Sequence, residues 1–337
     1  MRPQDAFHPP WWLANRHLQT VWGRLARTRR AVAFRREILE TRDGDEILLD
    51  HAGVQTAGAP RVLLVHGLEG SSHSVYVQGF LRRIARSGWR GTAMNFRSCA
   101  RDPGRLSRTL PNRRPRLYHS GETEDLDLVL TWLSRSQEGA PLAAVGVSLG
   151  GNVLLKWLGE RPGQNVLAAA AAISTPYDLA ACARHLESGL GRIYARSLLA
   201  TLRRKALEAA ARFPEAARAI NLERTRSSST FREFDDAATA PLHGFQGADD
   251  YYRRSSSLAF LTRIATPTLC LSAEDDPFLP AESLARARVA ASAFVEFVVT
   301  RRGGHVGWVT GRAPWRPLYW AEDLVVSWLA ARMGSLS

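Results

Sequence analysis

Cysteine and long apolar runs are both scarce in this 337-residue chain, and each scarcity excludes a class of protein. The cysteines are Cys99, Cys182 and Cys270, an odd number without a C-x-x-C pair, which argues against a disulfide framework and a zinc site. No run of about 18 apolar residues occurs, so we expect no membrane-spanning helix. The first 20 residues lack the apolar core of a secretory signal, so we expect a cytoplasmic location.

Lysine is also rare. Only Lys156 and Lys205 are lysines among 45 basic residues, so arginine carries nearly all of the formal charge of +13. The arginines are spread along the chain and form no long basic block, and we therefore expect no nucleic-acid partner. Weak peripheral attraction to anionic lipid is compatible with this charge. A P-loop, a dinucleotide fingerprint and metal-ligand spacing are missing too, so we expect no cofactor and no metal.

The chain does contain an alternation of continuous apolar runs and helical patterns. The expected strands lie at 34–51 (a hairpin turning at Asp43-Gly44), 59–70, 91–98, 142–147, 166–175, 266–277 and 294–300. The expected helices lie at 74–87, 121–135, 149–161, 281–290 and 316–333. Such alternation predicts an α/β fold with a mostly parallel central sheet and helices on both faces.

Two segments stand outside this alternation within the expected single domain 1–337. Residues 180–262 are helical in pattern, rich in Arg and Ser and without a buried strand, so we expect a helical lid or cap insertion over the carboxyl edge of the sheet. Residues 1–33 carry Trp11, Trp12 and Trp22. We interpret them as an N-terminal packing segment, with a membrane-interface anchor as the alternative.

The pattern G-x-S-x-G occurs at Gly146, Ser148 and Gly150, after an apolar run and before a helical pattern. A nucleophilic serine on a strained strand-to-helix turn leaves no room for neighbouring side chains, which explains the glycines. An ordinary turn of small residues is the alternative. The helix N-terminus would place the amide of Leu149 beside Ser148, where it could stabilise an oxyanion.

A serine nucleophile needs a base, and the base needs an acid. His305 follows the last expected strand, in the order nucleophile, acid, histidine. Asp276 lies at the end of the stretch 266–277, directly after its apolar run. It is our choice for the acid that orients His305, with Asp275 as the alternative. His66 ends an earlier strand, where we expect it to brace a loop by hydrogen bonding.

The remaining parts of the site are an oxyanion hole and an acyl pocket. The amide of Leu68, between Gly67 and Gly70, is expected to pair with that of Leu149 as the two donors. Phe245, Tyr251 and Tyr252 either line the acyl pocket or pack elsewhere.

Nine blocks in order give the chain a resemblance to a known family. They are PPWWLANRHLQTVW (9–22), VHGLEGSSHSVY (65–76), MNFRSC (94–99), YHSGETEDL (118–126), VGVSLGGNVLLKWLGE (145–160), REFDDAATAPLHGF (232–245), DYYRRSS (250–256), AEDDPF (273–278) and GGHVGW (303–308). The chain resembles the YheT-like esterases of the α/β-hydrolase superfamily, which implies an α/β-hydrolase fold with Ser148, Asp276 and His305 as triad. The chain departs from the family pattern in two places. Ser98 and Ala100 stand where the family usually has glycine and serine, and there is extra length at 109–116.

These features together predict a serine hydrolase that cleaves carboxylic esters of short to medium acyl chains through an acyl-enzyme. The expected partner is a small-molecule acyl ester or a lipid. An acyltransferase to an alcohol, a phospholipid-acting esterase and a non-catalytic binding module are the alternatives. Chain length, the alcohol group and oligomeric state are left open by the sequence.

Overall fold

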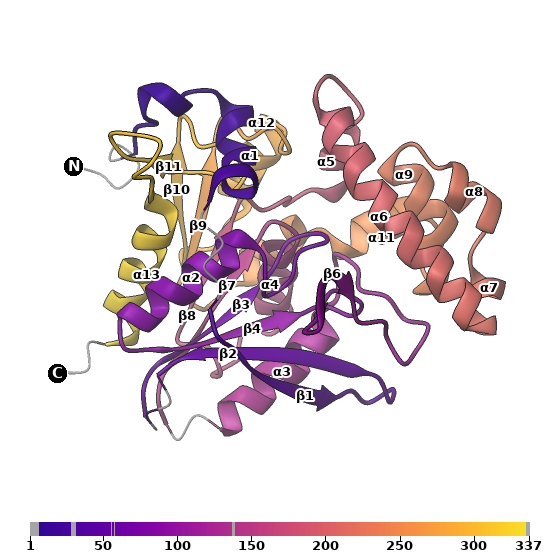
Figure 1. Ribbon diagram of the computed structural model, residues 1–337, viewed down its shortest axis with the longest axis horizontal. Coiled ribbons are helices and arrows are strands. Elements are labelled where there is room, and N and C mark those ends of the chain that lie inside the picture. The colour runs from indigo at the N-terminus through magenta and orange to yellow at the C-terminus, as the bar shows by residue number, and fades with distance from the viewer. Residues whose placement is uncertain (1–6, 28–31, 55, 57, 137–138, 335–337) are drawn as a thin grey trace.

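The computed structural model describes residues 7–27, 32–54, 56, 58–136 and 139–334. An eight-stranded sheet runs through it in the order β1-β2-β4-β3-β7-β8-β9-β10 (Figure 1). Its strands are β1 (Arg35–Glu40), β2 (Glu46–Gly53), β3 (Arg61–Val65), β4 (Arg90–Asn95), β7 (Leu142–Val147), β8 (Ala169–Ile173), β9 (Thr268–Ala273) and β10 (Val295–Thr300). From β4 to β10 the neighbours are parallel, and the antiparallel hairpin β1-β2 lies at one edge. The predicted mostly parallel sheet is confirmed.

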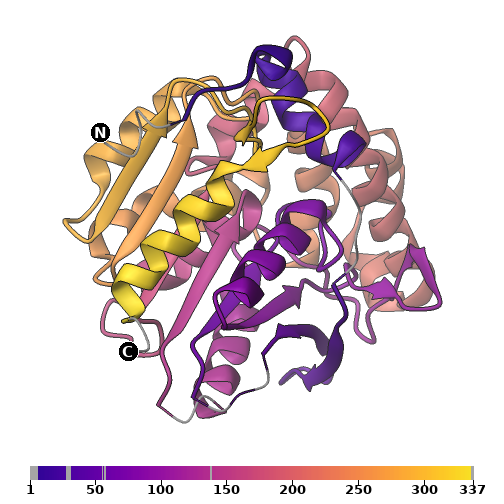
Figure 2. The same ribbon diagram turned by 60° about the vertical axis from the view of Figure 1, so that its left-hand side comes forward.

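Helices cover both faces of the sheet, as predicted. On one face lie α3 (Thr123–Arg135), α4 (Leu149–Glu160) and α12 (Ala281–Ala290), and on the other lie α2 (Val75–Arg86) and α13 (Trp320–Met333), the latter two in front of the strands in Figure 2. Successive residues of a strand point to opposite faces. Strand β3 accordingly sends Leu63 into the core beneath α3 and α4, and Leu64 into the core beneath α2 and α13.

A group of helices between β8 and β9 lies to one side of the sheet, at the right of Figure 1. We call α5 to α11 the cap. Its elements are α5 (Leu179–His185), α6 (Gly191–Arg212), α7 (Pro214–Ala219), α8 (Leu222–Ser227), α9 (Phe231–Phe234), the π-helix η3 (Asp235–Thr239), α10 (Ala240–Leu242) and α11 (Ala248–Ser255). The 3-10 helix η4 (Ser257–Arg263) then returns the chain to β9. In this described stretch the expected insertion 180–262 forms helices and no strand.

Several helices of the cap begin at a residue whose side chain accepts a hydrogen bond from a backbone amide of the first turn. Thr230 and Glu233 form a capping box at the start of α9, in which each side chain accepts a hydrogen bond from the other's backbone amide. Asp178 caps α5 and Asn221 caps α8, each by accepting one hydrogen bond from a backbone amide of the first turn. Short polar residues between helices therefore fix where each cap helix begins.

The N-terminal segment contributes the 3-10 helix η2 (Trp11–Leu13) and the helix α1 (Arg16–Ala26), neither of which was predicted. Of the expected packing segment 1–33, residues 1–6 and 28–31 lie outside the described residues. Trp12 packs on Trp22 with ring centroids 4.8 Å apart, and Trp12 Nε1 donates to the carbonyl of Gly311. Trp11, by contrast, is 84% exposed.

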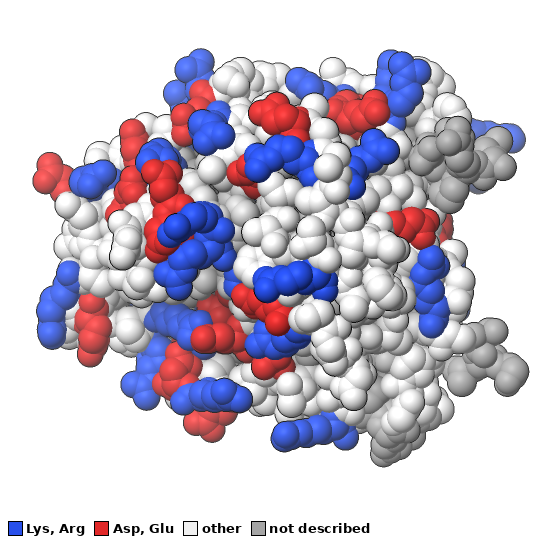
Figure 3. All heavy atoms as spheres, turned by 180° about the vertical axis from the view of Figure 1, so that it is seen from behind, with Lys and Arg blue, Asp and Glu red and all other residues white. Residues whose placement is uncertain are grey.

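Two short hairpins complete the fold, and neither was predicted. They are β5 (Arg101–Asp102) with β6 (Arg105–Thr109), and β11 (Val309–Thr310) with β12 (Leu318–Tyr319). None of the helices in the described residues combines the length and apolar character needed to cross a bilayer. On the face drawn in Figure 3, basic and acidic side chains are interspersed.

Candidate active site

Ser148 lies on a sharp turn between β7 and α4. Its backbone has φ 53° and ψ −120°, a conformation that residues other than glycine rarely adopt. The flanking glycines are required by contact distances: a Cβ on Gly146 would lie 2.4 Å from the carbonyl oxygen of Gly150, and one on Gly150 would lie 2.3 Å from that of Val65. Strain of this kind, held in place by packed neighbours, is frequent at functional sites.

His305 and Asp276 meet Ser148 at the same edge of the sheet. His305 Nε2 lies 3.0 Å from Ser148 Oγ. On the other side of the ring, His305 Nδ1 lies 2.9 Å from Asp276 Oδ2 and 3.1 Å from Oδ1, so Nδ1 donates to the carboxylate and Nε2 is free to accept from the serine hydroxyl. The three side chains sequence analysis selected are therefore in direct hydrogen-bond contact.

The neighbouring carboxylate, Asp275, faces a different way. Its Oδ1 accepts from the amide of Gly304, 2.9 Å away, so it holds the loop that carries His305 and does not contact the imidazole ring. Burial raises the pKa of Asp275, and the nearby charge of Asp276 adds to this effect. The backbone amide hydrogen bonds oppose it. Between the two candidate acids, Asp276 is the one placed to orient the base.

The turn at residues 67–70 approaches Ser148 from β3. It is closed by a hydrogen bond from Gly70 N to Gly67 O, and Gly67 N and Glu69 N donate to the hydroxyls of Tyr76 and Tyr118. In this described loop no hydrogen bond is recorded for the amide of Leu68. Leu68 and Leu149 both line the pocket beside Ser148, as an oxyanion hole requires.

His66 braces this turn from below, as expected. Its Nδ1 lies 2.8 Å from the carbonyl oxygen of Gly67, and its Nε2 accepts from the amide of Phe96. That pattern requires the proton on Nδ1. Burial lowers the pKa of His66 to about 4, so the ring is neutral at physiological pH. His66 is thus a structural residue of the turn.

A pocket extends from Ser148 under the cap, and most of its wall is apolar. The apolar and aromatic cap side chains that line it are Leu179, Cys182, Ala183, Leu186, Leu198, Leu202, Ala206, Phe231, Phe234, Ala238, Leu242, Tyr251 and Tyr252. The polar cap residues in the lining are Lys205, Asp235, Thr239 and His243. Of the aromatic residues selected from sequence, Tyr251 and Tyr252 line this pocket. Phe245 does not: it packs behind Tyr251, with ring centroids 5.2 Å apart, beneath the guanidinium of Arg254.

One buried carboxyl group interrupts the apolar wall. Asp235, in the π-helix η3, accepts hydrogen bonds from Tyr252 Oη at 2.7 Å and from Thr239 Oγ1 at 2.6 Å. Burial raises its pKa to about 7, against the opposing effect of these two hydrogen bonds. Its neighbour Asp236 accepts from the amide of Ala248. Asp235 and Asp236 therefore tie η3 to α11 by hydrogen bonds, which gives both acidic residues a structural role.

The rare lysine Lys205 links the cap to the turn at 67–70. Its Nζ, on α6, lies 2.8 Å from Glu69 Oε1 and 3.2 Å from Cys99 Sγ, and all three side chains are buried. Tyr118 Oη also donates to Glu69 Oε1. Burial raises the pKa of Cys99 to about 11, so this cysteine is a thiol and a poor nucleophile. The ion pair of Lys205 with Glu69 was not predicted from the sequence, although the scarcity of lysine was a signal.

Two further residues missed from sequence are His119 and Asn152. His119 is buried in the pocket wall, and burial lowers its pKa to about 3. Asn152, on α4, donates to the carbonyls of Ser120 and Ser255 and accepts from the amide of Ser257. It anchors the end of the cap to α4, the helix that follows Ser148.

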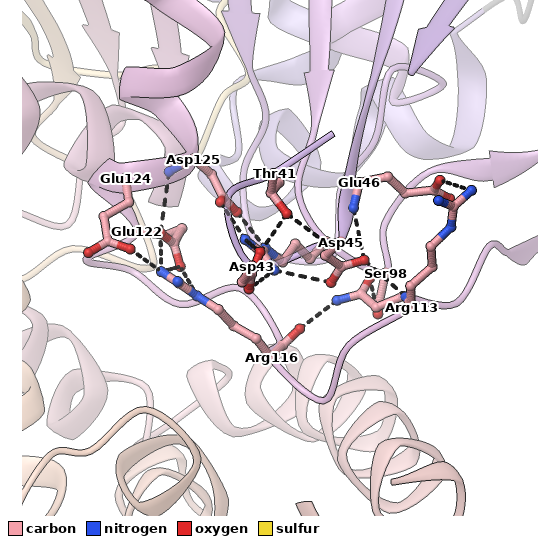
Figure 4. A network of polar contacts seen from close by, with 12 residues as sticks. Thr41, Asp43, Asp45, Glu46, Ser98, Arg113, Arg116, Glu122, Glu124 and Asp125 are labelled. Atoms are coloured by element: carbon pink, nitrogen blue, oxygen red, sulfur yellow. Dashed lines mark hydrogen bonds and ion pairs between the residues drawn. The ribbon is translucent and has the colours of Figure 1, made fainter. Parts of the chain in front are cut away.

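A buried arginine, Arg97, holds together an acidic cluster near the start of α3. Arg97 donates to Asp125, Asp43 and Asp45, which joins the β1-β2 turn to the start of α3, as Figure 4 shows for the acidic groups. Burial alone would raise the pKa of Asp43, but hydrogen bonds from Arg97 and Thr41 outweigh it and lower that pKa to about 2.

Both departures from the family pattern lie next to Arg97 and outside the pocket lining. Ser98 has φ 61°, the left-handed conformation that glycine adopts most readily, and its Oγ donates to Asn112. In the described residues, those of this loop that reach the pocket begin at Leu117. The departures from the family pattern therefore do not alter the residues that line the pocket.

Comparisons with known proteins show the family to which the chain belongs. The model of the alpha/beta hydrolase fold family matches residues 60–311. The chain is 38% identical to an Escherichia coli (strain K12) protein named "Putative esterase YheT", over 98% of this chain and 95% of that protein. It is 30% identical to the mouse protein named "Phospholipase ABHD3", over 92% of this chain and 75% of the other. A solved esterase of Pyrococcus furiosus shares the fold, with a TM-score of 0.57 at 16% identity over 90% of this chain and 92% of that one.

Proposed function

This chain belongs to the α/β-hydrolase fold family, in the branch of the Escherichia coli protein YheT, and on that premise we propose that it is a serine esterase. The proposed reaction is hydrolysis of carboxylic esters through an acyl-enzyme on Ser148. The observation that carries the proposal is the unbroken hydrogen-bonded series from Ser148 Oγ through both ring nitrogens of His305 to Asp276, at the end of an apolar pocket.

Each step assigns one task to a group already in place. Ser148 Oγ attacks the ester carbonyl carbon while His305 Nε2 takes its proton, and Asp276 stabilises the imidazolium that forms. The amides of Leu68 and Leu149 bind the oxyanion of the tetrahedral intermediate. When the intermediate collapses, His305 gives the proton to the leaving alcohol. Water, deprotonated by the same imidazole, then releases the acid and restores Ser148.

The pocket supports an apolar acyl group as the part of the substrate that is recognised. Leucine, alanine and phenylalanine side chains of the cap form most of its wall, and burying each methylene of a substrate there is worth about 0.8 kcal/mol. We therefore propose acyl chains of short to medium length, with Tyr251 and Tyr252 as wall residues and Phe245 as their support. The cap would act as a lid over the bound acyl chain.

Hydrolysis of p-nitrophenyl esters from acetate to palmitate tests the proposal. We expect a chain-length optimum for the wild type and a loss of at least about 10⁴-fold in Ser148→Ala, since removal of a triad serine leaves only binding and oxyanion stabilisation. Ser188→Ala, an exposed serine of the cap, serves as the matched control. Equal activity in Ser148→Ala and the control would remove Ser148 from the mechanism.

Lipid esters are the second candidate substrate class, because the pocket is apolar and a relative carries the name phospholipase. Fatty acid released from phosphatidylcholine vesicles and from monoacylglycerol micelles would be compared with release from p-nitrophenyl esters. Adding ethanol to the same assays separates hydrolysis from acyl transfer, because only transfer yields ethyl esters.

A further inference from the structure

Helix α1 lies directly against the loop that carries His305, and both are at the top of the molecule in Figures 1 and 2. Thr20 Oγ1, on α1, accepts a hydrogen bond from the backbone amide of His305 at 2.9 Å. One residue before it, the buried Gln19 pairs with Val309: its Oε1 accepts from Val309 N at 2.8 Å, and its Nε2 donates to Val309 O at 2.9 Å. Three hydrogen bonds thus join α1 to the backbone at 305–309.

The loop held by these bonds has an unusual backbone. Gly304, Val306 and Trp308 have φ values of 61°, 56° and 45°, all in the left-handed region. A non-glycine residue in that region persists only when the surrounding structure over-determines it. The loop therefore depends on contacts outside itself for its shape.

Those contacts come from two sides. From the sheet side, Asp275 accepts from Gly304 N and Ser174 Oγ accepts from Val306 N at 3.0 Å. From the opposite side comes α1, whose backbone is so close that a Cβ on Gly304 would lie 2.5 Å from the carbonyl oxygen of Arg16. The family model matches only from residue 60 onward, so this second support comes from outside the matched region.

Helix α1 also reaches the cap. His17 Nδ1 lies 3.1 Å from Tyr194 Oη on α6. Tyr194 packs on Phe278, and the ring of Phe278 stacks on that of His305 with centroids 4.2 Å apart. The imidazole ring is thus confined by a ring from the acid loop, while its backbone is fixed by α1.

We propose that Thr20 and Gln19 are positioning residues for the general base. By fixing the backbone at 304–309, they keep the imidazole of His305 within reach of Ser148 and Asp276 at the same time. The proposal rests on the proposed function, because a base needs this placement only if the serine is acylated. It makes an N-terminal helix part of the active site.

The test compares Thr20→Val, which has nearly the same shape but no acceptor, with Thr20→Ser, which keeps the hydroxyl. Thr201→Val is the matched control, because Thr201 makes the same bond to the carbonyl four residues earlier on its own helix and does not touch the histidine loop. Active sites are counted by titration with a fluorophosphonate, so kcat refers to folded, reactive molecules. If Thr20→Val fails to fold, Thr20→Ala replaces it.

We expect Thr20→Val to lower kcat per titrated site by about 10- to 100-fold with little change in KM, because the acyl pocket is left intact. Thr20→Ser and Thr201→Val should match the wild type. A kcat per site in Thr20→Val equal to that of the wild type would overturn the proposal, even if less protein folds. So would a rise in KM alone.

A second readout needs no catalysis. The proton that His305 Nδ1 shares with Asp276 should give a low-field NMR resonance in the wild type, displaced or lost in Thr20→Val and restored in Thr20→Ser. A wild type that is inactive and unreactive toward fluorophosphonate would refute the proposed function, and the NMR comparison would still decide the positioning role. An identical resonance in Thr20→Val and wild type would contradict that role.

Discussion

The pocket has two walls that are held in place differently. On the sheet wall, Ser148, Asp276 and His305 each follow a parallel strand within a few residues, so their positions are set by the strand order β7-β8-β9-β10. The cap wall consists of helices whose lining side chains are mostly apolar or aromatic. Polar contacts such as that of Lys205 with Glu69 join it to the body. Under the proposed function, the sheet wall would carry out the chemistry and the cap wall would select which substrates reach it.

The two walls also differ in their buried charges. The sheet wall keeps its carboxylates paired: Asp276 with His305, and Asp275 with an amide. The cap wall contains Asp235, whose partners are two neutral hydroxyl groups. We therefore expect substitutions in the sheet wall to change the rate of reaction, and substitutions in the cap to change stability and chain-length preference.

The largest effect is expected on the sheet wall, from Asp276→Asn. An amide at this position cannot hold the His305 tautomer that accepts from Ser148, and the equivalent change in a serine protease costs about 10⁴ in kcat. Asp275→Asn keeps an oxygen for the amide of Gly304 and should cost less than about tenfold. Steady-state kinetics of both variants would sharpen the distinction between the two acids, and a larger loss in Asp275→Asn would reverse our assignment.

The next largest effect is expected from breaking the ion pair of Lys205 and Glu69, which links the two walls. Lys205→Met leaves the Glu69 carboxylate buried with only Tyr118 as a side-chain donor, and we expect the free energy of unfolding to fall by about 4 kcal/mol. Adding Glu69→Gln to Lys205→Met should recover a large part of this loss, because the uncompensated charge is gone. Urea denaturation of both single variants and the double variant measures the coupling. Additive losses would show that the pair does not connect the walls.

Within the cap, Asp235 should make stability depend on pH. Its folded pKa of about 7 lies above the unfolded value of 3.8, so the folded state binds more protons between these values and stability falls as pH rises from about 4 to about 7. Asp235→Asn, which mimics the protonated acid toward Thr239 and Tyr252, should lose this dependence. Relative to the wild type, the variant should gain about 4 kcal/mol across that range, since the shift is from 3.8 to about 7. The free energy of unfolding of both proteins would be measured by denaturation across this pH range. If it depended on pH equally in the wild type and in Asp235→Asn, Asp235 would not be a buried, protonated acid.

The smallest expected effect is on substrate choice. Ala183→Leu adds bulk to the cap wall and should lower kcat/KM for the longest accepted ester by about tenfold, while acetate hydrolysis stays the same. Leu202→Ala enlarges the pocket and should move the optimum to longer chains. An identical chain-length profile in both variants and the wild type would place the acyl group outside the cap.

The sequence could predict a residue of these walls where a local sequence motif marks it, and could not where only a long-range contact does. Ser148 is marked by a strand, a glycine-flanked turn and a helix within about twenty residues. His305 and Asp276 are marked by their order after strands. Thr20 meets His305 only because α1 packs on a loop 285 residues away, and no local pattern reports that contact.

The cap shows the same limit. Its helices could be expected from composition, but the pairing of Lys205 with Glu69 joins residues 136 apart in the sequence. Tyr251, Tyr252 and Phe245 are close in the sequence, yet only the first two line the pocket, because Phe245 packs behind Tyr251. Which residue of an aromatic cluster reaches the cavity depends on helix packing, which periodicity alone does not determine.

Mass spectrometry of the protein after reaction with a fluorophosphonate tests the central claim most directly. We predict a single adduct on the peptide containing Ser148 in the wild type. Ser148→Ala should show no adduct, and His305→Ala should react far more slowly because the serine has lost its base. An adduct on another residue, or none on a folded wild-type protein, would contradict the assignment of Ser148 as the nucleophile.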